Sequence, residues 1–342
     1  MVKERDKVLA MALGLDPLGT SISPIKGGSE FASLLRAQSG GKQFFVKAGA
    51  GKRSKTMLEG EYESLNAIHT AVPELCPRPI AHGDLQDGGY FLATEFLQLH
   101  GSSFSRQQSS SRENTLALKL GKLHSQPAPS DGRYGFPVTT CCGSTPQDNS
   151  YEDTWSSFFV NRRLLPILDA CIESNGSQPE LADHVNRIIP IAKYLLSRLS
   201  PPSSQPVIIH GDLWSGNQCN GSIPPRIPNS TPVVFDPSSC YAPAEYDHGI
   251  MTMFGGFDRN FWEEYEAVVP RGEPAGEYED RVSLYRLYYT LNHFALFGGS
   301  YKSSAIGIMR ELRRKYRDRI DEPNTVQRPR FQSHGFVAIL AG

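Results

Sequence analysis

The sequence predicts an α+β protein built as two lobes. Residues 1–97 pass from strand patterns to a helical pattern and back, which indicates a small lobe with an antiparallel sheet and one main helix. Mostly helical spacing follows, so a larger and mainly helical lobe is expected over 98–320. The length of 342 residues also exceeds what one compact core usually organises. Few periodic apolar residues occur over 321–342, where we expect a loosely ordered tail.

The small lobe is expected to contain a capping helix, three strands and one longer helix. Helical spacing covers residues 8–15 and 55–70, β-prone runs cover 31–36, 44–46 and 90–96, and a turn is expected at 21–28. Pro73, Pro77 and Pro79 end the longer helix, because proline lacks the N–H that a helix requires. Lys47 directly follows the second run and is expected at the end of that strand.

The large lobe is expected to be a set of helices connected by loops. Helical patterns cover residues 116–124, 155–171, 181–199, 250–254, 262–265, 281–297 and 306–320. The serine-rich stretch 101–112 is interpreted as a flexible loop. Residues 125–150 lack periodicity, and the aromatic residues Tyr134 and Phe136 favour an ordered binding loop there.

The composition argues against two kinds of partner. The chain has 35 Lys and Arg against 36 Asp and Glu, so it creates no overall field that attracts nucleic acid or anionic lipid. No apolar run reaches the ~18 residues that a membrane-spanning helix needs. We therefore expect neither a nucleic acid nor a membrane as a partner.

The cysteines and the N-terminal residues favour a cytoplasmic protein. The six cysteines include no C-x-x-C pair, which argues against a zinc site and favours free thiols in a reducing compartment. The first six residues include two acidic side chains, and the apolar stretch after them is short. This start fits neither a secretory nor a mitochondrial signal.

The main chemical motif follows a β-branched run at 207–209. Asp212 comes shortly after that run, and Asn217 lies five residues further on. A second β run at 232–235 ends in Asp236. A base and two metal ligands presented at neighbouring strand ends are typical of a phosphotransferase catalytic loop. The motif therefore predicts a small-molecule kinase with a protein-kinase-like fold.

Each residue of this motif has an expected role. Asp212 is the candidate base for the attacking hydroxyl, and Asn217 and Asp236 are the candidate Mg²⁺ ligands, because magnesium prefers carboxylate and amide oxygens. Taken singly, either aspartate could instead be a turn-forming or capping residue. Their combined spacing favours catalysis. His210 is expected to brace the loop, and Asp247 either to cap the following helix or to brace the loop, rather than to react.

Lys47 is the candidate ligand for the ATP phosphates. Such a lysine needs an acidic partner, and Glu61 lies near the inward face of the next helix, with Glu59 as the alternative. A solvated lysine beside an acidic helix face is the competing interpretation. A G-x-G-x-x-G loop is absent, and only residues 26–29 could cover phosphates, where a plain hairpin turn is equally consistent.

Two further groups are placed by position alone. Glu95, Phe96 and Leu97 end the small lobe, where backbone groups between the lobes can bind adenine. Trp214 lies inside the catalytic loop, where its ring could either fill the core or stack on a substrate.

Over residues 8–315 the chain resembles the fructosamine/ketosamine 3-kinase family. The most specific segment is His-Gly-Asp-Leu-Trp-Ser-Gly-Asn at 210–217. Supporting segments are Phe-Phe-Val-Lys at 44–47, Met-Leu-Glu-Gly-Glu at 57–61, Thr-Thr-Cys-Cys-Gly at 139–143, Trp155 with Phe158 and Phe159, Phe-Asp-Pro-Ser at 235–238, Met-Phe-Gly-Gly-Phe at 253–257 and Leu-Asn-His at 291–293.

The resemblance implies an enzyme that uses ATP and Mg²⁺ to phosphorylate the 3-hydroxyl of the sugar on glycated amines. The phosphorylated product sheds its sugar, so the implied activity is deglycation. By resemblance, Trp214 and His293 are expected in the sugar pocket. Some family members link subunits through a cysteine in the phosphate loop, and residues 21–26 contain none, so we expect a monomer or weak dimer.

Two other functions compete with this one. A kinase for an aminoglycoside or choline would share the short catalytic loop, although a polycation pocket usually carries many carboxylates and residues 211–215 offer only Asp212. A nucleotide-binding pseudokinase would have lost the base or a metal ligand, and Asp212, Asn217 and Asp236 are all present.

Overall fold

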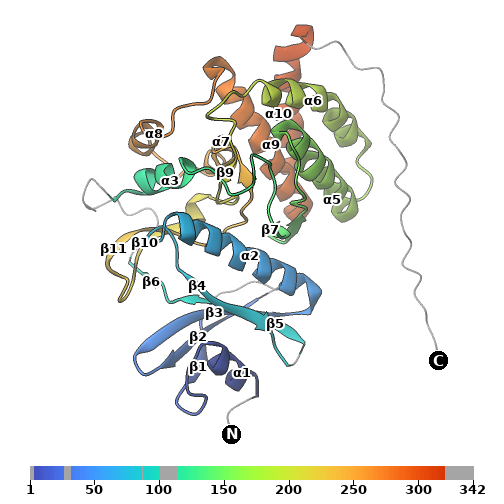
Figure 1. The fold of residues 1–342 in the computed structure, drawn as a ribbon. Coiled ribbons are helices and arrows are strands. Elements are labelled where there is room, and N and C mark those ends of the chain that lie inside the picture. Colours follow the sequence, from blue (N-terminus) through green and yellow to red (C-terminus); the bar gives the residue numbers. More distant parts are fainter. Residues whose placement is uncertain (1–3, 27–31, 87, 101–113, 320–342) are drawn as a thin grey trace, which may run out of the picture.

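The computed structural model describes residues 4–26, 32–86, 88–100 and 114–319 and has two lobes. Figure 1 shows the sheet and helices α1 and α2 in one lobe, and helices α5, α6, α9 and α10 in the other. This arrangement confirms the expected α+β architecture with a sheet-containing small lobe and a mainly helical large lobe. The serine-rich stretch and the tail expected to be loosely ordered lie outside the described residues.

The small lobe is a five-stranded antiparallel sheet in the order β1-β2-β3-β5-β4. Its strands are β1 (Ser21–Pro24), β2 (Ser33–Ser39), β3 (Lys42–Ala50), β4 (Pro79–Asp84) and β5 (Gly89–Glu95). Helix α1 (Glu4–Ala12) precedes the sheet, and the long helix α2 (Gly51–Ala71) connects β3 to β4.

Three expectations for this lobe were wrong. Part of the expected turn at 21–28 is the edge strand β1, because Ser21 pairs with Gln38 of β2. Lys47 lies within β3 rather than at its end, since pairing with β5 continues to Ala50. Strand β4 was not predicted, because proline, glycine and polar residues interrupt its apolar pattern and pairing with β5 is what makes it a strand.

The two faces of the sheet belong to different cores. Val46 and Ala93 pack in a cluster with Leu9 of α1, on one face. Leu92 packs in a cluster with Leu58 of α2, on the opposite face. Lys47 is directly opposite Leu92, and paired residues on antiparallel strands point to the same face. The register therefore directs the Lys47 side chain toward α2 and the other lobe.

The segment between the lobes is bound to the strands that follow the catalytic loop. Strand β6 (Gln98–Leu99) pairs with β10 (Gln218–Ile223), which in turn pairs with β11 (Ile227–Val234). A short pair of strands, β9 (Val207–Ile208) and β12 (Tyr241–Ala242), carries the start of the catalytic loop. The loop at 125–150 contains a hairpin of β7 (Thr140–Cys142) and β8 (Thr145–Gln147).

The large lobe is a helical layer around one continuous core. Its helices are α3 (Leu116–His124), α4 (Trp155–Phe158), α5 (Leu165–Asn175), α6 (Pro179–Ser197), α7 (Glu245–Met251), α8 (Arg259–Glu266), α9 (Tyr278–Phe297) and α10 (Tyr301–Tyr316). The single helix expected at 155–171 is interrupted by a π-helical segment, Phe159–Leu164. Short 3₁₀ turns lie at Ser215–Asn217, Ala275–Glu277 and Arg317–Arg319.

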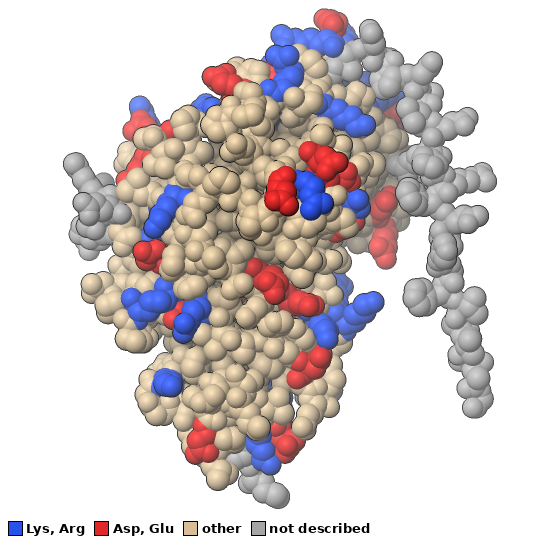
Figure 2. Space-filling model, viewed as in Figure 1, with Lys and Arg blue, Asp and Glu red and all other residues tan. Residues whose placement is uncertain are grey.

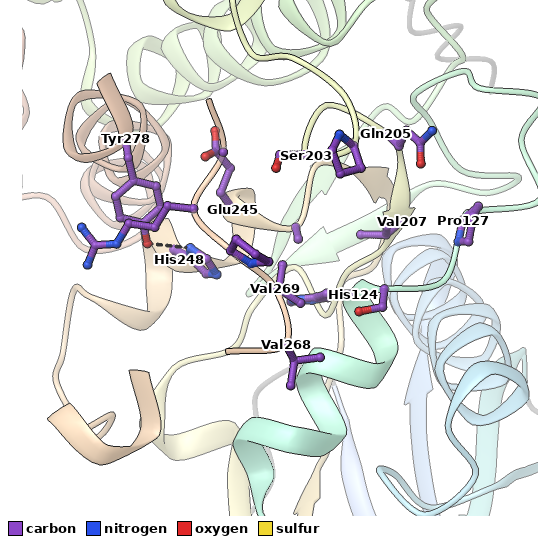
Figure 3. Close-up of a pocket in the computed structure, with 16 residues that line it drawn as sticks. His124, Pro127, Ser203, Gln205, Val207, Glu245, His248, Val268, Val269 and Tyr278 are labelled. Carbon is purple, nitrogen blue, oxygen red and sulfur yellow. Dashed lines mark hydrogen bonds between the residues drawn. The ribbon is translucent and has the colours of Figure 1, made fainter. Parts of the chain in front are cut away.

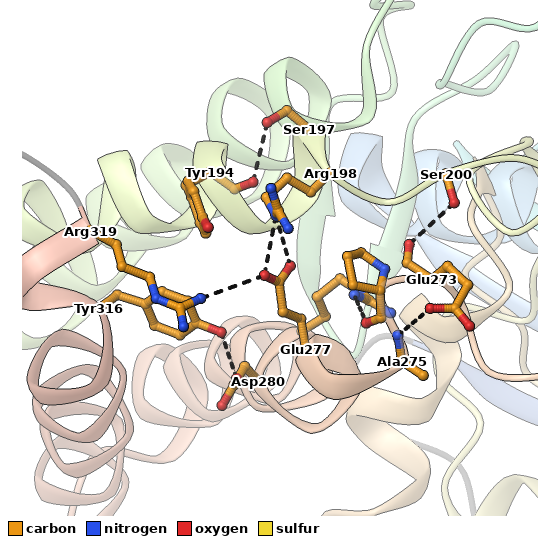
Figure 4. Close-up of polar contacts among 12 residues, drawn as sticks. Tyr194, Ser197, Arg198, Ser200, Glu273, Ala275, Glu277, Asp280, Tyr316 and Arg319 are labelled. Atoms are coloured by element: carbon orange, nitrogen blue, oxygen red, sulfur yellow. Dashed lines mark hydrogen bonds and ion pairs between the residues drawn. The ribbon is translucent and has the colours of Figure 1, made fainter.

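Polar contacts fasten the ends of three helices in this lobe (Figure 4). Arg198, just after α6, donates from Nε to Glu277 Oε1 at 3.1 Å. Tyr316 of α10 donates its hydroxyl to Asp280 of α9 at 2.6 Å. The Glu277 and Asp280 side chains are largely buried, so these charge-assisted bonds fix how the helices meet.

On the face drawn in Figure 2, positive and negative side chains of the described residues are intermixed. This mixing agrees with the formal net charge of −1. None of the helices in the described part of the chain combines the length and apolar character needed to cross a bilayer.

Candidate active site

A side chain of α7 anchors the backbone of the catalytic loop. Asp247 accepts hydrogen bonds from the backbone N–H groups of His210 at 2.8 Å and Gly211 at 2.7 Å. The His210 ring lies 3.1 Å from the Phe235 carbonyl through Nε2. These contacts confirm that His210 and Asp247 brace the loop. Both side chains are fully buried, so the loop is held rigidly against the core.

Gly211 is required by the shape of this loop. Its φ is +82°, a region that disfavours residues with a Cβ. A Cβ at this position would also collide with the Ser238 carbonyl. The motif glycine therefore allows the loop to turn closely over the segment that follows Asp236.

Asp212, Asn217 and Asp236 are brought together by the loop and its strand. Asn217 Nδ2 donates to the Asp212 carbonyl at 2.8 Å and lies 3.5 Å from the carboxylate Oδ2. The Asn217 carbonyl accepts the N–H of Phe235 at 3.1 Å. Asp236 follows immediately, with a φ of 58° that turns the chain out of β11. The predicted base and both predicted metal ligands therefore occupy one small region.

Lys47 connects the two lobes at this region. Its Nζ lies 2.8 Å from both carboxylate oxygens of Glu61 on α2. The same atom lies 2.8 Å from Asp236 Oδ1, across the boundary between the lobes. Burial opposes the ammonium charge, but the carboxylates of Asp236 and Glu61 raise the pKa of Lys47. Lys47 is therefore charged, and Glu61 rather than Glu59 is its partner.

Carboxyl groups are crowded in this region, since Glu61 and Asp236 contact Lys47 and Asp212 lies close by. Burial raises the pKa of Asp212 to about 8, and the carboxylates of Asp236 and Asp247 act in the same direction. The thiol of the buried Cys142 and the amide of Asn217 are hydrogen-bonded to Asp212 and partly oppose this shift. A cation placed among these carboxylates would relieve their repulsion.

The oxygen donors fit magnesium in its usual nucleotide-bound form. One carboxylate and one amide are hard ligands, and magnesium in kinase sites takes its other ligands from phosphates and water. Across the described ranges, no group of three His, Cys, Asp or Glu side chains is placed to hold a metal. A metal here would thus depend on Asn217, Asp236 and the phosphates of a nucleotide.

The residues expected between the lobes are largely engaged with protein. Arg226, near the turn between β10 and β11, donates from Nε to both carboxylate oxygens of Glu95, at 3.1 and 3.0 Å. The N–H of Glu95 bonds to the Arg78 carbonyl, and its own carbonyl accepts from Thr94. Arg36 lies over the Phe96 ring at 4.5 Å. Any backbone contact to adenine would therefore come from Phe96 or Leu97. Most of the segment at 26–29 considered for phosphate contact lies outside the described residues.

The two residues expected in the sugar pocket are connected through a third. Trp214 is 40% exposed, and its ring centroid lies 5.9 Å from that of Phe254. The Phe254 centroid lies 5.2 Å from that of His293 on α9. His293 Nδ1 is 2.8 Å from the Tyr289 carbonyl, and a carbonyl only accepts, so Nδ1 carries the proton. Burial lowers the pKa of His293, so the ring is neutral and Nε2 is an acceptor.

Sequence reasoning missed three residues that complete the site. Arg226 gave no local signal, because its partner Glu95 is far away in the chain. Cys142, in the Cys-Cys-Gly segment, contacts Asp212, and Asn292 donates to the Cys142 carbonyl at 3.2 Å. Their segments were noted only as part of the family resemblance.

A separate cavity of about 260 Å³ lies behind the catalytic loop (Figure 3). Its lining includes His124, Val207, Glu245, His248 and Tyr278. None of the residues assigned to phosphoryl transfer lines it. His124 connects it indirectly to the loop, since His124 Nε2 lies 3.3 Å from Asp247 Oδ2. This cavity is therefore distinct from the Lys47–Asp236 region.

A two-lobed fold with a lysine–glutamate pair facing a loop of aspartate, asparagine and aspartate defines the class of kinase-like phosphotransferases. Residues 1–315 match the family model described as fructosamine kinase. The chain belongs to the fructosamine kinase family.

Named relatives agree with this assignment. Ketosamine-3-kinase of Mus musculus is 32% identical over 285 residues, which are 78% of this chain and 87% of that protein. The chloroplastic protein-ribulosamine 3-kinase of Oryza sativa subsp. japonica is 33% identical over 310 residues, covering 87% of this chain and 84% of that protein.

Solved structures share the fold. A putative fructosamine-3-kinase from Haemophilus somnus has a TM-score of 0.70 at 23% identity, covering 90% of this chain and 96% of that one. Aminoglycoside phosphotransferase APH(4)-Ia, in a ternary complex with ADP and hygromycin B, has a TM-score of 0.57 at 13% identity, with 91% and 98% covered.

Proposed function

We propose that this protein is an ATP-dependent kinase that phosphorylates the sugar 3-hydroxyl of ketosamines, such as fructosamines and ribulosamines on amines or proteins. Family membership supports the reaction class, and the named relatives support the substrate class. The single observation that carries the proposal is Lys47 Nζ at 2.8 Å from both Glu61 and Asp236, next to the loop that holds Asp212.

Each side chain has a role in this proposal. Lys47 binds the α- and β-phosphates while Glu61 orients it, and backbone at Phe96 and Leu97 receives adenine. Trp214 and His293 hold the sugar, with His293 Nε2 accepting a hydrogen bond from a sugar hydroxyl. Asn217 and Asp236 would hold magnesium, which would supply positive charge that neutralises the phosphates.

The transfer itself needs one proton acceptor. As the sugar oxygen bonds to the γ-phosphorus, the bond to the β–γ bridging oxygen breaks and ADP leaves. Asp212 accepts the hydroxyl proton. Its raised pKa makes it a stronger base than an exposed aspartate. Loss of the sugar from the phosphorylated product would make the reaction a deglycation step.

We also propose a cytoplasmic protein that acts as a monomer or weak dimer. All six cysteines lie among the described residues, and each is a free thiol. Five of the six are buried, which suits a compartment where thiols stay reduced.

An ATP-consumption assay with fructosyl-lysine, ribulosyl-lysine, kanamycin and choline tests the proposed substrate class. Turnover of a ketoamine, with phosphate recovered on the sugar 3-oxygen, is the expected result. Turnover of kanamycin or choline without either ketoamine would contradict it.

The variant Lys47→Met tests the carrying observation. It should lower kcat/KM by about 10² or more, because the phosphates lose their positioned cation. Lys42→Met, on the same strand but exposed, is the matched control and should retain wild-type turnover within about twofold. Equal activity of both variants would remove Lys47 from the site.

A further inference from the structure

Beyond the sugar pocket, a stripe of aromatic side chains continues across the large lobe. The rings follow one another from Trp214 to Phe254 and His293, and then to Phe297 and Tyr301. The His293 centroid lies 5.6 Å from that of Phe297 and 5.2 Å from that of Tyr301. We call these five residues the aromatic stripe.

The aromatic stripe starts at the chemistry and runs outward. Trp214 lies two residues after Asp212, and a Cβ on Gly216 would collide with the Trp214 ring, which therefore lies back over the catalytic loop. A Cβ on Gly256 would collide with Ser215, so the segment carrying Phe254 also packs directly on this loop. The stripe is thus continuous with the candidate active site.

The side of the stripe formed by α9 is also fixed next to the base. Asn292 donates to the Cys142 carbonyl, and Cys142 contacts Asp212. His293 is the next residue of α9, and Phe297 lies one helical turn further on. The helix therefore points the stripe from the base toward its own C-terminal end, where the chain turns into α10.

Three of the five rings in the stripe are exposed, Trp214 among them, while His293 and Tyr301 are partly buried. Phe254 is 42% exposed and Phe297 is 70% exposed, although large apolar side chains are usually covered. A run of exposed aromatic rings that starts in an active site is typical of a binding surface. Among the described residues, Phe297 therefore leaves most of its ring open to solvent.

The stripe is longer than a sugar needs. A lysine stem of four methylene groups spans roughly 6 Å, given bonds of about 1.5 Å. The steps from His293 to Phe297 and to Tyr301 are 5.6 and 5.2 Å. A lysine carrying its sugar against Trp214 and His293 would thus bring the peptide backbone, and the side chains of neighbouring residues, to Phe297 and Tyr301.

From this geometry we infer that the aromatic stripe binds the peptide around a glycated lysine and favours apolar, above all aromatic, residues beside it. This inference rests on the proposed ketosamine kinase function and adds to it a preference for the residues beside the modified lysine. The carrier is a flexible peptide segment, because the stripe is an open surface that an extended chain can follow.

Two glycated pentapeptides test this inference. Both carry fructosyl-lysine at the centre, flanked by phenylalanine in one and by glycine in the other. The wild-type protein should show a higher kcat/KM for the phenylalanine peptide, by roughly two- to tenfold, since one aromatic contact contributes about 0.5–1.5 kcal/mol. Phe297→Ser should remove most of this preference. Leu18→Ser, which alters an 85% exposed residue of the small lobe, should keep it.

The outcomes separate the two proposals. Equal kcat/KM for the two peptides in the wild-type protein, or a preference that survives Phe297→Ser, would overturn the role of the stripe. Free fructosyl-lysine is assayed in parallel. No turnover of any of the three compounds would overturn the proposed function itself. Far-UV circular dichroism of Phe297→Ser confirms that a lost preference comes from a folded protein.

Discussion

At the scale of single residues, the site combines groups that would repel one another if left alone. The carboxyl groups of Asp236 and Asp247 both lie close enough to Asp212 to raise its pKa. Lys47 supplies the positive charge from the other lobe. Such an arrangement favours binding of a cation over stability of the free protein. It also separates the effect of a substitution on turnover from its effect on folding.

Asp212→Asn should abolish turnover and stabilise the free protein. The carboxyl has a pKa of about 8 in the folded protein, above its usual 3.8, so the folded form binds more protons between those values. Stability is therefore lost as pH rises through that window, and the asparagine removes this loss. Turnover should fall ~10²–10⁴-fold, while Tm at pH 8 rises, at about 2–4 °C per kcal/mol.

Thermal unfolding and ATP consumption measured on one sample provide the check. Asp153→Asn, at an exposed position, should change neither quantity. A variant Asp212→Asn with a lower Tm at pH 8 than the wild type would show that Asp212 is not under electrostatic strain.

At the scale of elements, the β10–β11 hairpin joins the candidate metal ligands to the inter-lobe segment that is proposed to receive adenine. Its base delivers Asn217 and Asp236, and its turn carries Arg226. The Arg226 guanidinium holds the pKa of Glu95 below its usual value against the effect of burial. It also donates to the carbonyls of Pro73 and Cys76, in the connection between α2 and β4. One side chain therefore joins the hairpin, the inter-lobe segment and the small lobe.

Arg226→Met should weaken ATP binding more than acceptor binding. Losing the guanidinium leaves the half-buried Glu95 carboxylate and two carbonyls without their donor, at a cost of about 1–3 kcal/mol. We expect KM for ATP to rise about tenfold and KM for the ketoamine to stay within about twofold. Steady-state kinetics with each substrate varied in turn measures both.

A matched substitution distinguishes the loss of the Arg226 contacts from a general loss of positive charge. Arg187→Met removes an exposed arginine that pairs with Asp183 on the same helix, and surface pairs contribute little. It should leave both KM values unchanged. A proportional change in the two KM values of Arg226→Met would indicate a structural role only.

At the scale of the whole molecule, the large lobe holds several neutral histidines. His248 is 4% exposed, and burial, assisted by His124, lowers its pKa from 6.5 to about 3. Its Nδ1 is hydrogen-bonded to the Tyr278 hydroxyl at 2.9 Å, at the edge of the cavity behind the catalytic loop (Figure 3). The unfolded chain would protonate this ring at a much higher pH than the folded protein does.

Acid should therefore unfold this lobe, and His248→Gln should reduce the effect. A folded pKa below the unfolded value means that the contribution is complete above about pH 6.5 and is lost as pH falls toward about 3. Urea midpoints between pH 7 and 4 should fall less steeply for His248→Gln than for the wild type. His100→Gln, at an exposed position, should follow the wild-type curve, and an unchanged slope for His248→Gln would contradict the assignment.

Local patterns located most helices and the reactive loop, but the helix predicted at 155–171 is interrupted at Phe159–Leu164 and the one predicted at 250–254 is Glu245–Met251. The helix at 116–124 has the predicted ends, and α9 and α10 differ from prediction by a few residues. The spacing of Asp212, Asn217 and Asp236 was informative because a catalytic loop is one continuous stretch. Strands β1 and β4 were missed because an edge strand depends on its partner rather than on its own apolar pattern.

The sequence by itself determined the two-lobed α+β class and the phosphotransferase loop, and it favoured Glu61 over Glu59 as the partner of Lys47. These features depend on the spacing of residues that lie close together in the sequence. Only the tertiary structure decided that Lys47 lies within its strand and reaches Asp236, and that Arg226 binds Glu95. It also decided that the aromatic stripe extends beyond Trp214 and His293. Those contacts join residues far apart in the chain, and they arise from sheet register and lobe packing, which no local pattern encodes.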